Sequence, residues 1–84
     1  MAYIVQKSAA KMPSSCKGKY VRIAVLEVAD GVTHVSMISD RAKGVKRVVR
    51  TWEGCHDGKT AKSASHLALA EAHELAFTLN QSAS

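Results

Sequence analysis

The apolar residues of this chain follow a strand-like pattern in its first two thirds and a helical pattern in its last third. Residues 20–29 (YVRIAVLEVA), 32–39 (VTHVSMIS) and 45–52 (VKRVVRTW) are rich in β-branched side chains, which favour a pleated and half-buried backbone. Residues 3–7 (YIVQK) are a shorter run of the same kind within an N-terminal segment, residues 1–18. We therefore expect three strands, with a possible first strand at the N-terminus as a fourth.

The first two long runs are separated by Asp30 and Gly31. Asp-Gly is a strong hairpin signal, because a type I′ turn needs positive φ at both central positions. In the resulting register, positions whose numbers sum to 61 face each other. Residues 40–44 (DRAKG) form the next turn, and its length of four or five residues leaves the register of the third strand open.

This register divides the hairpin into two faces. The better core candidate carries Ala24, Leu26, Val28, Val35 and Met37. The other face is also apolar enough to need a cover, for which the N-terminal segment is a candidate. It carries Val21, Ile23, Val25 and Ile38.

Residues 61–79 are rich in alanine and have one apolar stripe at 100° per residue, the signature of an amphipathic helix. Thr60 or Ser63 can cap its start, and residues 80–84 are expected to fray. The stripe consists of Ala61, Ala64, Ala68, Ala72, Leu75, Ala76 and Leu79. We therefore predict one α+β domain over residues 1–84: a three- to four-stranded antiparallel β-meander with a long C-terminal helix on one face.

A second stripe lies on the opposite side of the helix. His66, Ala70, His73 and Phe77 follow each other at helical spacing. An exposed phenylalanine beside histidines is typical of a partner-binding patch. The alternative is that the stripe packs under the N-terminal segment or in a homodimer.

The chain has a net charge of +5, and all twelve of its lysines and arginines lie in residues 1–62. Such a basic surface suits nucleic acid or an acidic partner, although cations also improve solubility and protect sheet edges. The few aromatic residues weaken the case for an RNA-binding sheet. The candidate contact residues are Arg22, Arg41, Lys43, Lys46, Arg47 and Arg50.

Residues 54–60 (GCHDGKT) lie between the last strand and the helix. They are one residue shorter than the phosphate loop G-x-x-x-x-G-K-[ST], and the expected antiparallel sheet differs from the parallel sheet of nucleotide-binding folds. We therefore expect no nucleotide hydrolysis. Lys59 and Thr60 remain a possible non-catalytic anion site at the start of the helix, the alternative being a plain turn with a helix cap.

No arrangement of residues indicates catalysis or metal binding. The two cysteines and four histidines lack the spacing of a zinc site, and no nucleophile has an evident orienting partner. We expect a non-enzymatic protein without metal or cofactor. Residues 1–11 lack a secretory apolar segment, and no run is long enough to span a membrane. We therefore expect a cytoplasmic protein with reduced cysteines, Cys55 being a small buried or half-buried residue.

Two resemblances concern the type of fold. Three antiparallel strands followed by a helix, over about residues 19–80, are similar to the first half of ribonuclease-H-like folds, but the acidic metal ligands of that family are missing, so the resemblance implies no activity. The short chain, small sheet, single helix and lack of a catalytic arrangement also resemble small inhibitor proteins of phages and mobile elements, such as anti-CRISPR proteins. That resemblance implies steric blocking of a host nucleoprotein complex.

These observations predict a binding protein, monomeric or homodimeric, that contacts and blocks a protein or nucleoprotein partner. The contact surface is expected to be the basic sheet edge or the helix stripe of His66, His73 and Phe77. The alternative is a small nucleic-acid-binding protein that uses the cations of residues 41–50. We expect no membrane partner.

Overall fold

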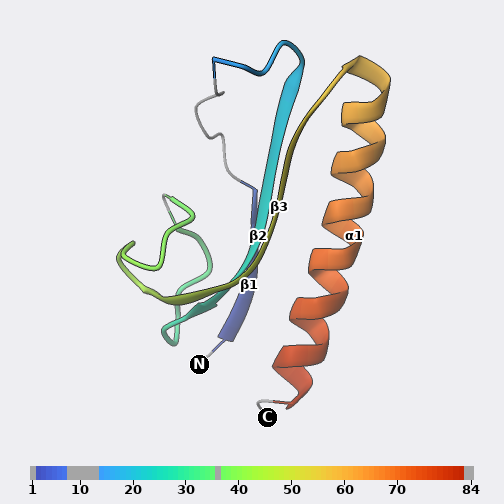
Figure 1. Cartoon of the computed structure of the whole chain (residues 1–84). Helices are drawn as coiled ribbons and strands as arrows, with labels where there is room; N and C mark the ends of the chain where they lie inside the picture. Colours follow the sequence, from blue (N-terminus) through green and yellow to red (C-terminus); the bar gives the residue numbers. More distant parts are fainter. Residues whose placement is uncertain (1, 8–13, 36, 83–84) are drawn as a thin grey trace.

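The computed structural model describes residues 2–7, 14–35 and 37–82. The fold is α+β: an antiparallel sheet with the strand order β1-β2-β3, followed by one long helix that runs along one face of the sheet (Figure 1). This arrangement confirms the predicted meander with a C-terminal helix. The elements are β1 (Ala2–Lys7), β2 (Lys19–Val28), β3 (Val45–His56) and α1 (Gly58–Ser82).

Strand β2 is the centre of the sheet. It pairs with β1 from Lys7 opposite Ile23 to Ala2 opposite Val28. On its other side it pairs with the longer β3 along its whole length, with two irregularities near the end of β2. Residues 19–22 of β2 therefore extend beyond the last residue of β1.

The predicted Asp30-Gly31 hairpin is wrong, and so is the strand at 32–39, since no described residue of that segment belongs to a strand. Gly31 has a φ of 86°, but Asp30 does not have the positive φ that a type I′ turn needs. The N–H of Val32 donates to the carbonyl of Ala29 (3.1 Å), as in a type II turn. That turn does not match the twist of a two-strand ladder, so the chain leaves the sheet and β2 pairs with β3 instead.

The segment 29–44 leaves β2 and returns beside it, where the N–H of Ala29 donates to the carbonyl of Gly44 (2.9 Å). Its residues Val35 and Ile38 are buried against the sheet face that carries Ala24, Leu26 and Val28. The predicted grouping of that face with Val35 is thus confirmed, although a loop and not a strand supplies the contact. The inclusion of Met37 was wrong, because its side chain is 55% exposed. The placement of Ile38 on the opposite face was also wrong, because Ile38 is buried on this one.

Helix α1 packs on the other face of the sheet, where Ile23 and Val25 contact Ala68, Ala72 and Ala76. The prediction of an alanine stripe against the sheet is confirmed. The sequence had suggested the N-terminal segment as the cover of this face. That suggestion was wrong, because β1 pairs at the edge of β2. With the helix on one side and the 29–44 segment on the other, the middle of β2 is buried on both faces.

The helix is longer than predicted at both ends and includes residues 80–82, which were expected to fray. Asn80 explains the difference at the C-terminal end. Its side chain accepts a hydrogen bond from the N–H of Tyr3 (2.9 Å) and donates one to the Tyr3 carbonyl (3.0 Å). The end of α1 is thus fixed to β1, while residues 83 and 84 lie outside the described part of the chain.

Candidate binding surfaces

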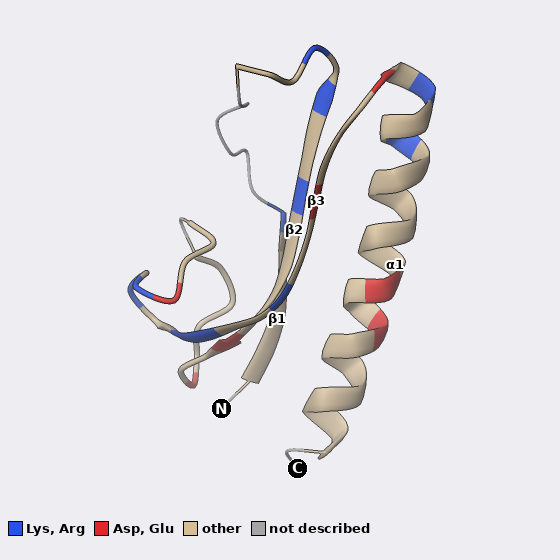
Figure 2. Cartoon of the chain, in the orientation of Figure 1, with Lys and Arg blue, Asp and Glu red and all other residues tan. Residues whose placement is uncertain are grey.

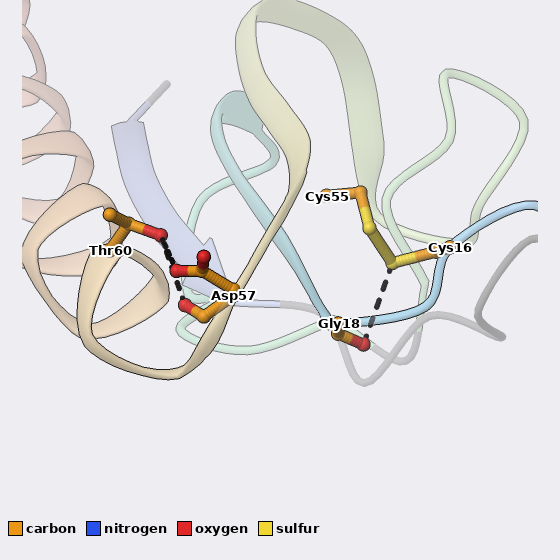
Figure 3. Close-up of a disulfide and its surroundings, with 5 residues drawn as sticks. All are labelled: Cys16, Gly18, Cys55, Asp57 and Thr60. Atoms are coloured by element: carbon orange, nitrogen blue, oxygen red, sulfur yellow. Dashed lines mark hydrogen bonds between the residues drawn. A yellow bond between two sulfur atoms is a disulfide. The ribbon is translucent and has the colours of Figure 1, made fainter.

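The junction between β3 and α1 is one residue, Asp57, because β3 continues to His56 and α1 starts at Gly58. The hydroxyl of Thr60 donates to the Asp57 carbonyl (3.1 Å) and also to the Asp57 carboxylate (Figure 3). The carboxylate of Asp57 thus lies at the positive end of the helix, where an external anion would bind. The anion site at Lys59 and Thr60 stays a prediction, and the position of Asp57 counts against it.

Cys16 and Cys55 form a disulfide, with their Cα atoms 5.6 Å apart (Figure 3). The expectation of reduced cysteines was therefore wrong, and so was the interpretation of Cys55 as a buried or half-buried residue, because its side chain is exposed. The bond joins the segment before β2 to the end of β3. Gly18 lies at the same crossing, and a side chain there would collide with the carbonyl of His56. Sequence spacing gave no sign of this pairing, because the two residues are 39 positions apart.

Three of the six predicted basic contact residues are engaged within the fold. The Arg22 guanidinium donates to the Ile38 carbonyl (3.3 Å), and its Nε lies 3.3 Å from a Glu53 carboxylate oxygen without hydrogen-bond geometry. Arg47 pairs with Glu27 (3.5 Å). Arg50 lies over the ring of Trp52, with 4.9 Å between the guanidinium carbon and the ring centre.

The other three predicted basic residues, Arg41, Lys43 and Lys46, are exposed at the end of the 29–44 segment and the start of β3. Figure 2 shows Lys and Arg gathered at this end of the molecule, with acidic positions beside them. We call Arg41, Lys43 and Lys46 the loop patch. The structure therefore divides the predicted basic surface. Arg22 belongs to the opposite part of β2, and Arg47 and Arg50 are exposed but contact Glu27 and Trp52.

The predicted helix stripe is exposed. His66, His73 and Phe77 lie on the side of α1 away from the sheet, and the Phe77 side chain is 64% exposed. Tyr3 and Val5 pack against the inner side of the helix, so β1 does not cover Phe77. Leu67, which the sequence interpretation missed, is 67% exposed beside His66. We call His66, Leu67, His73 and Phe77 the outer helix face.

Tyr20 and Glu53 interact near the start of β2. A hydrogen bond to Glu53, followed by partial desolvation and the charge of that carboxylate, raises the pKa of Tyr20 above the ordinary value for tyrosine. The phenol thus stays protonated at neutral pH and acts as a donor. In the described part of the chain, no three side chains of His, Cys, Asp or Glu gather closely enough to hold a metal ion.

Comparison of the chain with protein-family models, with curated proteins and with solved structures found no match. Within residues 2–7, 14–35 and 37–82, no helix is long and apolar enough to cross a membrane.

Proposed function

We propose that this protein is a non-enzymatic binding protein that contacts a protein or nucleoprotein partner through the outer helix face and blocks it. The observation that carries the proposal is the exposure of Phe77 on the side of α1 that the sheet leaves uncovered, together with that of Leu67, which also lines the groove between α1 and β3. Burying a large apolar side chain at an interface stabilises a complex by about 1.5–3 kcal/mol, so these two residues would supply part of the binding free energy of the helix.

The charges along α1 describe the partner further. Lys59 and Lys62 lie near the start of the helix, whereas Glu71 and Glu74 lie near its middle (Figure 2). A groove that receives this helix would therefore have an apolar floor, with acidic residues near Lys62 and basic residues near Glu74. The most concrete form of the proposal is an inhibitor of host nucleoprotein machinery, the role of the anti-CRISPR proteins that the chain resembles in type.

The proposed site of action is cytoplasmic, where thiol reductants keep most cysteines reduced. The proposal therefore requires that the domain keep its fold after reduction of the Cys16–Cys55 bond. The composition of the core supports this requirement, because neither of its two clusters of buried residues contains a cysteine.

Partner binding can be tested by comparing substitutions of exposed apolar residues at two places. Phe77→Glu and Leu67→Glu change the outer helix face. Met37→Glu is the matched control, because it makes the same change of charge at an exposed apolar residue outside α1. We expect affinity capture to recover a partner with the wild-type protein and with Met37→Glu, even after nuclease treatment. Both helix variants should fail to recover it. Equal recovery by all the variants would exclude the outer helix face as the contact surface.

A second candidate function is nucleic-acid binding, which the solvent exposure of the loop patch favours. If Arg41, Lys43 and Lys46 each neutralise one phosphate, the logarithm of the affinity should fall with the logarithm of the salt concentration with a slope of about −3. Gel shifts over a salt series measure this slope. A Lys43→Glu variant should weaken binding, whereas Phe77→Glu should not; no shift at low salt would exclude this function.

A further inference from the structure

A groove opens where β1 ends. β1 stops opposite Ile23, whereas β2 begins at Lys19. The first residues of β2, which lie near the N-terminal part of α1, therefore have no β1 residue paired beside them. The space has a volume of about 620 Å³, within the range of about 300–1,000 Å³ that is usual for small-molecule sites. It is separate from the outer helix face except for His66, which contributes to its rim.

The groove is basic. Lys7 from β1, Lys19 from β2 and Lys62 from α1 all line it, and all three are exposed. Arg22 also lines it, but its guanidinium lies beside Glu53. Among the described residues that line the groove there is no aspartate or glutamate. Three lysines from three different elements therefore line one space, and no carboxylate among the described residues that line it compensates their charge.

The register of the sheet explains this convergence. Side chains alternate between the two faces of a strand, and Lys19 precedes Ile23 by an even number of residues. Lys7 pairs directly with Ile23. Both lysines therefore lie on the face of the sheet that Ile23 presents to α1. Lys62 follows the buried Ala61 on the helix. The floor between these cations is apolar and includes Val21 and Leu69.

The groove on the other side of α1 is different. It lies between β3 and the helix, has a volume of about 370 Å³, and is lined by Glu53 and Glu71. The Trp52 indole N–H donates to the Glu71 carboxylate across it (2.7 Å). The absence of acidic lining is therefore a property of the first groove and not of the helix–sheet boundary in general.

We infer that the groove between β1, β2 and the start of α1 binds a phosphate-bearing ligand of about mononucleotide size. Lysine ammonium groups are mobile point charges that suit a multiply charged phosphate, and the floor at Val21 and Leu69 accepts a flat apolar body. A free nucleotide and the 5′-phosphorylated end of a nucleic acid share this chemistry. The groove shares Lys62 and His66 with the helix surface proposed to bind the partner.

Titrations of the folded protein with adenosine 5′-monophosphate, adenosine and inorganic phosphate test the inference, with amide chemical shifts and calorimetry as readouts. We expect saturable binding of the monophosphate, with shifts in residues 19–21 and 62–69. The affinity for adenosine should be lower than that for the monophosphate by a factor of about ten or more, because adenosine lacks the charged groups that the lysines would contact. Equal binding of nucleoside and monophosphate, or no saturable binding of either phosphate probe, would overturn the inference.

Lys62→Glu and Lys19→Glu should each weaken binding of the monophosphate about tenfold or more, since each replaces an attractive charge with a repulsive one. Lys46→Glu is the matched control, because it makes the same change of charge at an exposed lysine of the loop patch. An equal loss with Lys46→Glu would reduce the effect to net charge and refute the site. Circular dichroism verifies that each variant is folded.

The two sources of phosphate are separated by a trinucleotide with a 5′-phosphate and the same trinucleotide with a 5′-hydroxyl. Stronger binding of the 5′-phosphorylated trinucleotide than of the monophosphate would assign the groove to a nucleic-acid end. Equal or weaker binding would assign it to a free nucleotide.

Discussion

At the scale of single residues, backbone conformation explains why the chain leaves the sheet after β2. Gly31 and Gly44 have φ values of 86° and 88°, in the left-handed region that other residues rarely adopt. Each follows a residue with negative φ in a turn closed by a hydrogen bond, from Val32 to Ala29 and from Val45 to Ala42. The two glycines thus define the ends of the 29–44 segment, whose apolar residues cover the second face of the sheet.

Replacing either glycine with alanine should lower the free energy of unfolding by about 1–2 kcal/mol, the cost of a left-handed conformation for a residue with a Cβ. Gly44→Ala should cost more than Gly31→Ala. A Cβ at position 44 would meet Val32 Cγ2 at 3.1 Å, whereas one at position 31 would have no neighbour within 4 Å. Urea denaturation of the two variants measures the difference; equal costs would mean that Val32 moves aside without penalty.

At the scale of elements, small residues set how α1 lies on the sheet. Ala68, Ala72 and Ala76 face Ile23 and Val25, so the helix can approach the strands closely. Ala70 lies between Ala68 and Ala72 in the sequence, but on the opposite side of the helix, where it is exposed to solvent. The same residue type thus serves as a packing contact on one side of the helix and as a helix former on the other.

Ala72→Leu should therefore destabilise the fold by about 1–3 kcal/mol, because the added atoms have no room between α1 and β2. Ala70→Leu is the control: it makes the same change on the outer side of the helix, and its cost should stay within about 0.5 kcal/mol. Thermal or urea unfolding of both variants provides the comparison. Similar stability of the two variants would show that the helix can shift away from the sheet without cost.

At the scale of the whole molecule, the disulfide connects parts of the chain that the core does not hold together. Cys16 precedes β2 and Cys55 lies near the end of β3, whereas both clusters of buried side chains lie elsewhere. A small domain buries a limited core, so a covalent link that restricts its unfolded state contributes a large share of the total stability.

The double variant Cys16→Ser, Cys55→Ser should remain folded and lose about 2–4 kcal/mol of unfolding free energy, as expected for a link across 39 positions. Treating the wild-type protein with a reductant should give the same loss, which makes reduction an internal control. Unfolding curves in urea, with and without reductant, measure both. Loss of the fold in the double variant would contradict the proposed action in a reducing compartment.

The charge distribution also belongs to this scale. The sequence singled out six cations as one basic surface, but the fold engages Arg22, Arg47 and Arg50 with other groups. It places Lys7, Lys19 and Lys62 around one groove instead, and Lys62 comes from an element that is distant in the sequence from the other two. No spacing rule could indicate that cluster, because it depends on where β1 ends and on which face α1 covers.

The sequence by itself determined β2, β3 and α1, since the β-branched runs of the two strands and the alanine period of the helix express local preferences, but no described residue of the β-branched run at 32–39 belongs to a strand. It also determined which side of the helix meets the sheet and which side carries His66, His73 and Phe77. Only the tertiary structure decided the strand pairing, the covers of the two sheet faces, the Cys16–Cys55 bond and which cations remain accessible. These features depend on contacts between distant residues, whose free energies are set by packing and not by local preference.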